Sequence, residues 1–188
     1  MKKAIIIIAA LMLTGCTTRE AQTAAFPLEA QASDAVKEPA EKQAKASFTT
    51  WYRKSGKNRS KNIELAAEAI NGYVIMPGAT FSFNDAVGPT GKASGYKLAT
   101  VYFNKKKTKG YGGGVCQVST TLFNAAEIAG MEIVERHKHP EPVPYVEEGR
   151  DATTSGRGKL DLKIKNISPE PMTIKTTAEK GVLTVEIY

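Results

Sequence analysis

The sequence contains 188 residues and carries a formal net charge of +7, and this length predicts one folded domain rather than two. The basic residues are spread along the chain, and the one local run, at residues 105–107, is typical of a solvated turn. We therefore expect no nucleic-acid partner. The charge is compatible with a partner that bears carboxylates or phosphates, such as a cell-wall polymer or lipid head groups.

The N-terminus predicts export. Two lysines precede an apolar segment at residues 4–13, which is too short to span a bilayer permanently. Leu13-Thr14-Gly15-Cys16 then matches the lipobox of bacterial lipoproteins. We expect a signal peptide at residues 1–15, cleavage before Cys16 and a lipid on its thiol. The protein would then be anchored to the extracytoplasmic side of a bacterial membrane, in the cell envelope. An ordinary signal peptide with an incidental cysteine is the alternative.

The chain divides by composition after the signal peptide. Residues 16–47 are rich in Ala, Glu, Lys, Gln, Thr and Pro and poor in large apolar side chains. Such a segment cannot bury enough apolar surface to fold alone, so we predict that it is a tether that begins with the lipidated cysteine. The folded domain is predicted at residues 48–188.

Helical and extended patterns alternate within this domain. Helices are predicted at residues 62–71 and 117–129, each with an apolar face and a glycine close behind. A loop is predicted at residues 84–95. The pattern indicates an α+β fold in which two principal helices pack against a mainly antiparallel sheet. Strands are predicted at residues 73–76, 80–83, 99–104, 132–136, 160–165, 172–176 and 182–187.

Residues 110–120 form the most informative stretch. Cys116 follows a run of three glycines and stands at the start of the second predicted helix. Glycines such as Gly113 and Gly114 let the backbone approach a ligand closely. A helix N-terminus offers unpaired N–H groups and a partial positive charge, which lower the pKa of a thiol. The pattern indicates a nucleophile with an oxyanion site beside it. A buried, unreactive cysteine is the alternative.

The chain has two histidines, His137 and His139, and they share a face if the backbone there is extended. Cysteine with histidine is the minimal pair for thiol acyl transfer, and a third group usually orients the imidazole. Asp151 is the preferred candidate for that third group. Either histidine could instead only form hydrogen bonds in a loop.

Two further alternatives concern the same residues. Glu135 and Asp85 are weaker candidates for the orienting carboxylate. Cys116 and the two histidines could also form a three-ligand zinc site. The glycine-rich context does not resemble a zinc-binding loop, and no second cysteine of the domain supports one, so we expect neither a metal nor another cofactor.

Polar residues near Cys116 could contact a ligand. Gln117, Ser119 and Thr120 lie on the first turn of the predicted helix. They could cap the helix or bind a carboxylate or a peptide carbonyl of a substrate. Arg150 could hold a substrate carboxylate in a bidentate pair, or could pair with a neighbouring acidic residue.

Several of these motifs, in this order, resemble the VanW-like family, and the resemblance covers roughly residues 60–166. Pro140 departs from the family pattern, which usually has serine after the second histidine, and the stretch after residue 153 is more polar than usual. The motifs that carry the resemblance are residues 71–74, 77–84, Gly88, 95–96, 112–120, 124–125, 135–137, 142–146 and 149–153.

The resemblance implies L,D-transpeptidation of peptidoglycan, with Cys116 as the nucleophile that forms a thioester with the third residue of a stem peptide. It favours His139 as the base, with His137 second. The residues themselves, rather than the resemblance, provide the candidate substrate contacts, which are Gly113, Gly114, Gln117, Ser119, Thr120 and Arg150. Attack by water on the thioester would make the protein an L,D-carboxypeptidase. A non-catalytic accessory protein that binds the cell wall in a glycopeptide response is the alternative from a different functional class.

Overall fold

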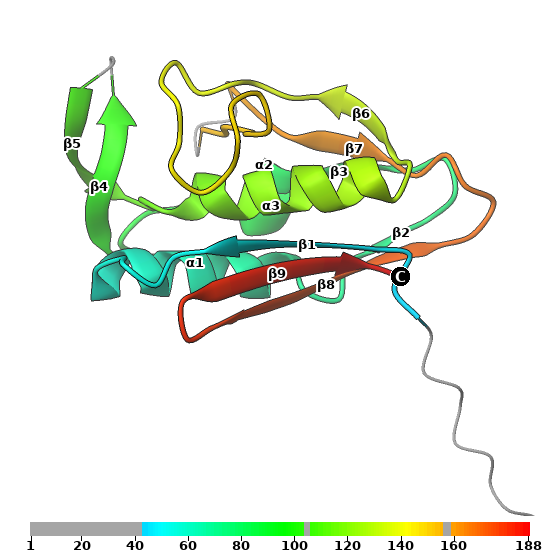
Figure 1. The fold of residues 1–188 in the computed structure, drawn as a ribbon, viewed down its shortest axis with the longest axis horizontal. Helices are drawn as coiled ribbons and strands as arrows, with labels where there is room; N and C mark the ends of the chain where they lie inside the picture. The colour runs from blue at the N-terminus through cyan, green and yellow to red at the C-terminus, as the bar shows by residue number, and fades with distance from the viewer. Residues whose placement is uncertain (1–42, 104–105, 156–158) are drawn as a thin grey trace, which may run out of the picture. The chain divides into compact units, whose positions relative to one another are not determined.

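The computed structural model describes residues 43–103, 106–155 and 159–188 (Figure 1). The predicted signal peptide, Cys16 and most of the predicted tether lie outside the described residues. The first described strand begins at Ala46, two residues before the predicted start of the domain. Within these ranges, no helix is both long enough and apolar enough to cross a membrane.

The larger sheet contains four antiparallel strands in the order β1-β9-β8-β2. Its central strand β9 alternates half-buried and buried residues, so that Leu183, Val185 and Ile187 point into the core. The apolar period of two in the sequence therefore explains this sheet. The strands are β1 (Ala46–Trp51), β2 (Val74–Ile75), β8 (Met172–Glu179) and β9 (Val182–Ile187).

A second sheet and a separate hairpin complete the strands. The second sheet has the antiparallel order β3-β7-β6, and β4 pairs with β5 alone. The hairpin projects at one end of the molecule, beside the beginning of α1 (Figure 1). These strands are β3 (Thr80–Ser82), β4 (Leu98–Phe103), β5 (Lys106–Tyr111), β6 (Glu132–Glu135) and β7 (Lys163–Lys165).

Three helices are described: α1 (Lys57–Ile70), the short α2 (Phe83–Val87) and α3 (Val115–Ile128). Helix α3 runs between the two sheets and contacts β1 and β9 on one side and β6 on the other (Figure 1). Helix α1 packs against β8 and α3. Because α3 is covered from several sides, it is buried around most of its circumference from Val115 to Ala126.

The predicted α+β class with antiparallel pairing is confirmed, and the structure adds elements that the sequence pattern does not show. Helix α1 begins at Lys57, five residues before its predicted start. The apolar pattern does not reveal these residues because the first turn is polar. The short α2 begins at Phe83, the last residue of a predicted strand, and extends into the predicted loop. Ser82 caps it by accepting a hydrogen bond from the Asp85 N–H at 3.1 Å. Strand β5 was missed because it is lysine-rich and largely exposed.

The glycine run before α3 is packed tightly against its neighbours. A Cβ placed on Gly113 would lie 2.5 Å from the Thr100 carbonyl oxygen and 2.9 Å from the Ala99 Cβ. Gly114 has a left-handed backbone conformation with φ 116° and faces α1. Packing therefore requires glycine at both positions, whatever they contribute to a substrate site.

We predict that Gly113→Ala lowers the free energy of unfolding by about 1–3 kcal/mol, the usual cost of overpacking. The added methyl group meets backbone on β4, which cannot move aside as a flexible side chain can. Urea denaturation measures this loss. Gly91→Ala is the matched control, because a Cβ at Gly91 meets nothing within 4 Å. Equal stability of the two variants would contradict the prediction.

Candidate functional site

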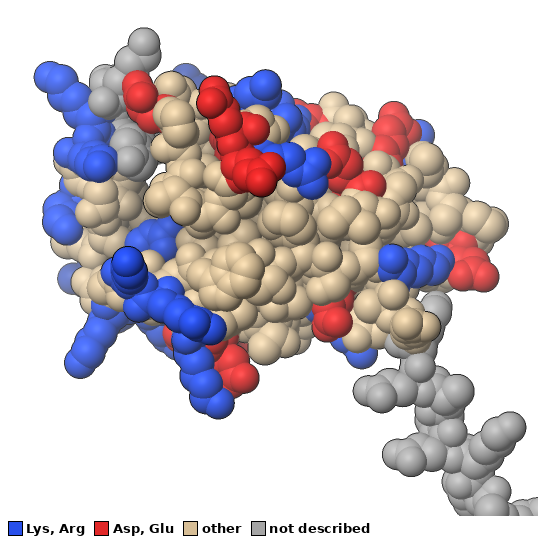
Figure 2. Space-filling view, viewed as in Figure 1, with Lys and Arg blue, Asp and Glu red and all other residues tan. Residues whose placement is uncertain are grey.

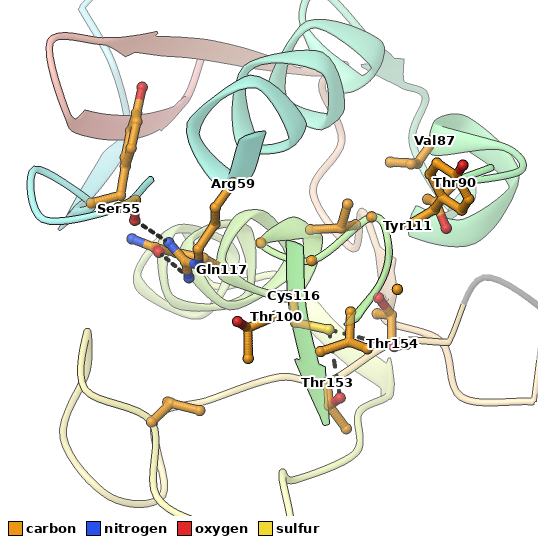
Figure 3. Close-up of a pocket in the computed structure, with 18 of the residues that line it drawn as sticks. Ser55, Arg59, Val87, Thr90, Thr100, Tyr111, Cys116, Gln117, Thr153 and Thr154 are labelled. Atoms are coloured by element: carbon orange, nitrogen blue, oxygen red, sulfur yellow. Dashed lines mark hydrogen bonds between the residues drawn. The ribbon is translucent and has the colours of Figure 1, made fainter. Parts of the chain in front are cut away.

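Cys116 is the second residue of α3 and a free, half-buried cysteine. Its Sγ lies 3.5 Å from the Thr154 carbonyl oxygen, which can accept from the thiol, and 3.7 Å from the Thr153 Oγ1 (Figure 3). Val115 and Gln117 donate their N–H groups to carbonyls of the glycine loop. None of the described residues accepts from the N–H of Cys116 itself, so this donor is available beside the thiol.

His139 lies between Cys116 and Asp151. Its Nδ1 is 2.6 Å from the Asp151 Oδ2, and its backbone N–H donates to the same oxygen at 2.6 Å. Because Nδ1 is engaged in this way, Nε2 is the ring nitrogen left to interact with the Cys116 thiol, and the two groups shift each other's pKa. The side chains of His139 and Asp151 are each only 10% exposed. A thiol, an imidazole and a carboxylate thus form a chain of three groups.

The pKa values within this chain favour its charged form. Burial alone would raise the pKa of the Cys116 thiol, but His139 beside it holds that pKa below its ordinary value. Burial would lower the pKa of His139, but Cys116 and Asp151 together raise it above its ordinary value. Both directions favour a thiolate beside an imidazolium, which is the reactive form of a cysteine nucleophile.

Hydroxyl groups of α3 hold the segment that carries Asp151. Ser119 Oγ donates to the Ala152 carbonyl at 2.7 Å, and Thr120 Oγ1 accepts from the Ala152 N–H at 2.9 Å. Arg136 Nε donates to the Asp151 carbonyl at 2.7 Å from the other side. Ser119 and Thr120, predicted to bind substrate, therefore have partners inside the protein and position the carboxylate.

The remaining predicted residues lie in different places. Gln117 is buried in the pocket wall and hydrogen-bonds Arg59, Thr50 and Trp51. His137 does not join the chain of three groups, because its Nε2 is 2.9 Å from the Glu135 Oε1.

Arg150 pairs with Glu127 at a more exposed position. It lines a second, smaller pocket next to β1 rather than the pocket beside Cys116. Asp85 is not among the residues that line the pocket beside Cys116 either. In the part of the chain that the structure describes, no group of three or more His, Cys, Asp or Glu side chains is arranged to hold a metal ion.

Cys116 and His139 open onto a pocket of ≈ 1800 Å³. Two of its residues, Arg59 and Tyr145, were not singled out from the sequence. Burial is the main cause that raises the pKa of the Tyr145 phenol, and the nearby Cys116 adds to the shift, so the phenol stays protonated.

Lys and Arg side chains gather on the surface over β4, β5 and the beginning of α1 (Figure 2).

Residues 58–188 match the family described as VanW like protein. The chain therefore belongs to the VanW-like family, which confirms the resemblance seen in its motifs. It is 43% identical over 141 residues to the uncharacterized protein YoaR of Bacillus subtilis (strain 168), covering 75% of this chain and 46% of YoaR. It is 40% identical over 114 residues to the vancomycin B-type resistance protein VanW of Enterococcus faecalis (strain ATCC 700802 / V583), covering 58% and 41% of the two chains.

The matched region spans less than half the length of each of these relatives. No solved structure is significantly similar to this chain.

We predict that the alkylation rate of Cys116, plotted against pH, has its inflection below about pH 8.5, the pKa of a free thiol. His139→Gln removes the imidazole that stabilises the thiolate while burial remains, so its inflection should move to higher pH. Iodoacetamide labelling of the full-length chain with Cys16→Ser measures this, because the sequence contains only two cysteines. His137→Gln is the matched control and should not shift the inflection. An unchanged inflection in His139→Gln would contradict the prediction.

Proposed function

We propose that this protein is a cysteine-dependent acyl transferase of the L,D-transpeptidase type that acts on peptidoglycan stem peptides. The observation that carries the proposal is His139, whose Nδ1 lies 2.6 Å from the Asp151 Oδ2 and which lines one pocket together with Cys116, where the two groups shift each other's pKa toward the thiolate and the imidazolium. A nucleophile, a base and a group that orients the base are the parts that acyl transfer by a covalent intermediate requires.

In the first half-reaction the Cys116 thiolate attacks the carbonyl carbon of the third residue of a stem peptide. A C–S bond forms and the carbonyl oxygen becomes an oxyanion. The N–H of Cys116 and the N-terminus of α3 stabilise that charge, and one such donor typically contributes about 3–4 kcal/mol. The C–N bond to the terminal D-Ala then breaks. The His139 imidazolium gives its proton to the departing amine, and a thioester remains.

In the second half-reaction an amine attacks the thioester. The now neutral His139 accepts a proton from the side-chain amine of a neighbouring stem peptide, and a new amide bond forms as the C–S bond breaks. The thiolate and the imidazolium are restored. Water in place of the amine would release a tripeptide, which is L,D-carboxypeptidase activity. Asp151 stabilises the imidazolium in both half-reactions.

The assignment to peptidoglycan has support of three kinds. The family resemblance implies this substrate, and the name of one relative connects that protein with vancomycin resistance. The lipobox at residues 13–16 and the preceding apolar segment favour a lipoprotein anchored on the extracytoplasmic side of a bacterial membrane, where such a substrate lies. Stem peptides are anionic, which suits a pocket with lysine and arginine side chains.

Incubation of the full-length Cys16→Ser chain with disaccharide-tetrapeptide tests the proposal. Mass spectrometry should detect free D-Ala together with a cross-linked dimer or an acyl-enzyme, and Cys116→Ala should abolish all of these. His139→Gln should reduce kcat by about 10²–10⁴-fold, the usual contribution of a general acid–base. His137→Gln, in which the lost ring pairs only with Glu135, is the matched control. Equal peptide binding without product in parent and Cys116→Ala would instead support a non-catalytic cell-wall-binding accessory protein.

A further inference from the structure

The pocket beside Cys116 carries positive charge that its own lining does not balance. Among the described lining residues, five are Lys or Arg and none is Asp or Glu. Arg59 differs from the other four because it is half-buried, whereas Arg53, Lys54, Lys107 and Lys159 are exposed. A partly desolvated cation is costly unless an anion balances it, so the charge of Arg59 points to an anionic ligand.

The guanidinium of Arg59 is held in a fixed orientation without being neutralised. Its NH1 donates to the Ser55 Oγ at 2.7 Å and its NH2 to the Gln117 Oε1 at 2.9 Å (Figure 3). Both acceptors are uncharged, and no carboxylate of the described residues forms an ion pair with this group. A guanidinium has five N–H donors, so others remain for a ligand. Fixing it in advance lowers the entropy cost of binding.

Arg59 also lies next to the end of α3 that carries the thiol. A Cβ placed on Gly114 would be 3.0 Å from the Arg59 Cγ, and Gly114 is the N-cap residue two positions before Cys116. Burial lowers the pKa of Arg59, and the nearby Tyr145 and Cys116 counteract this shift, as expected for groups that share one pocket. A ligand carboxylate on Arg59 would therefore lie close to the carbonyl that Cys116 attacks.

We propose that Arg59 binds the C-terminal carboxylate of the peptide that acylates Cys116, an inference that rests on the proposed function. In a tetrapeptide stem this carboxylate belongs to the departing fourth residue, directly after the reactive carbonyl. The planar guanidinium matches a carboxylate in a bidentate pair, which lysine cannot reproduce. Arg59 thus selects donor peptides that end one residue beyond the reactive carbonyl and disfavours longer or amidated ones.

Binding to the full-length Cys16→Ser/Cys116→Ala chain tests this assignment. Trp51 is the single tryptophan and lines the pocket, so its fluorescence can report binding. The two probes are the stem tetrapeptide with a free C-terminus and the same peptide with a C-terminal amide. The free acid should bind roughly 10- to 100-fold more tightly, as expected for hydrogen bonds between charged groups. Arg59→Met should weaken binding of the acid alone and remove this preference.

Lys61→Met is the matched control, because Lys61 lies on the same helix and pairs with Glu64 outside the pocket. It should retain the preference for the acid. Equal binding of acid and amide to the parent chain, or an unchanged preference in Arg59→Met, would overturn the proposal. So would equal weakening of both peptides in Arg59→Met, which is the result of a merely structural role. This binding assay needs no turnover. A preference for the acid that Arg59→Met removes, together with no D-Ala release by the chain that keeps Cys116, would disprove the transferase function and leave Arg59 assigned.

Discussion

The site depends on the hydrogen bonds between α3 and the backbone of Ala152. Ser119 and Thr120 bind both polar groups of this residue, and they do so in the buried core, where an unsatisfied partner would cost about 1–3 kcal/mol. Asp151 precedes Ala152 directly and orients His139. Because Cys116 stands on the first turn of the same helix, these contacts fix the thiol, the imidazole and the carboxylate to one rigid element.

This arrangement explains why a helix buried between two sheets carries so many polar residues. Gln117, Ser119, Thr120 and Asn124 are buried, and each forms hydrogen bonds inside the protein. Apolar residues in place of Ser119, Thr120 and Asn124 would fill the core as well, but they could not hold the loop that carries Asp151. Polar groups with satisfied partners specify one geometry, whereas apolar packing tolerates several.

Local features of the site could be predicted from the sequence, whereas features that depend on long-range contacts could not. The position of Cys116 follows from a glycine run and a helical period, which are both local signals. The partners of Ser119 and Thr120 lie more than thirty residues away, so the local pattern, which offered helix capping or substrate contact, could not predict them. Arg59 lies in the polar first turn of α1, before the point where apolar periodicity reveals the helix.

Cys116 is both half-buried and held as a thiolate, and cationic groups in its pocket offset the cost of burying that charge. Burial disfavours a thiolate, and the nearby His139 must overcome that cost before any substrate arrives. A substrate carboxylate that entered the pocket alone would add a second negative charge next to the sulfur and raise the thiol pKa further. Binding of that carboxylate by Arg59 would cancel its charge locally. Under the proposed function, the same guanidinium would both select an anionic donor and keep the Cys116 thiol ionised while the donor is bound.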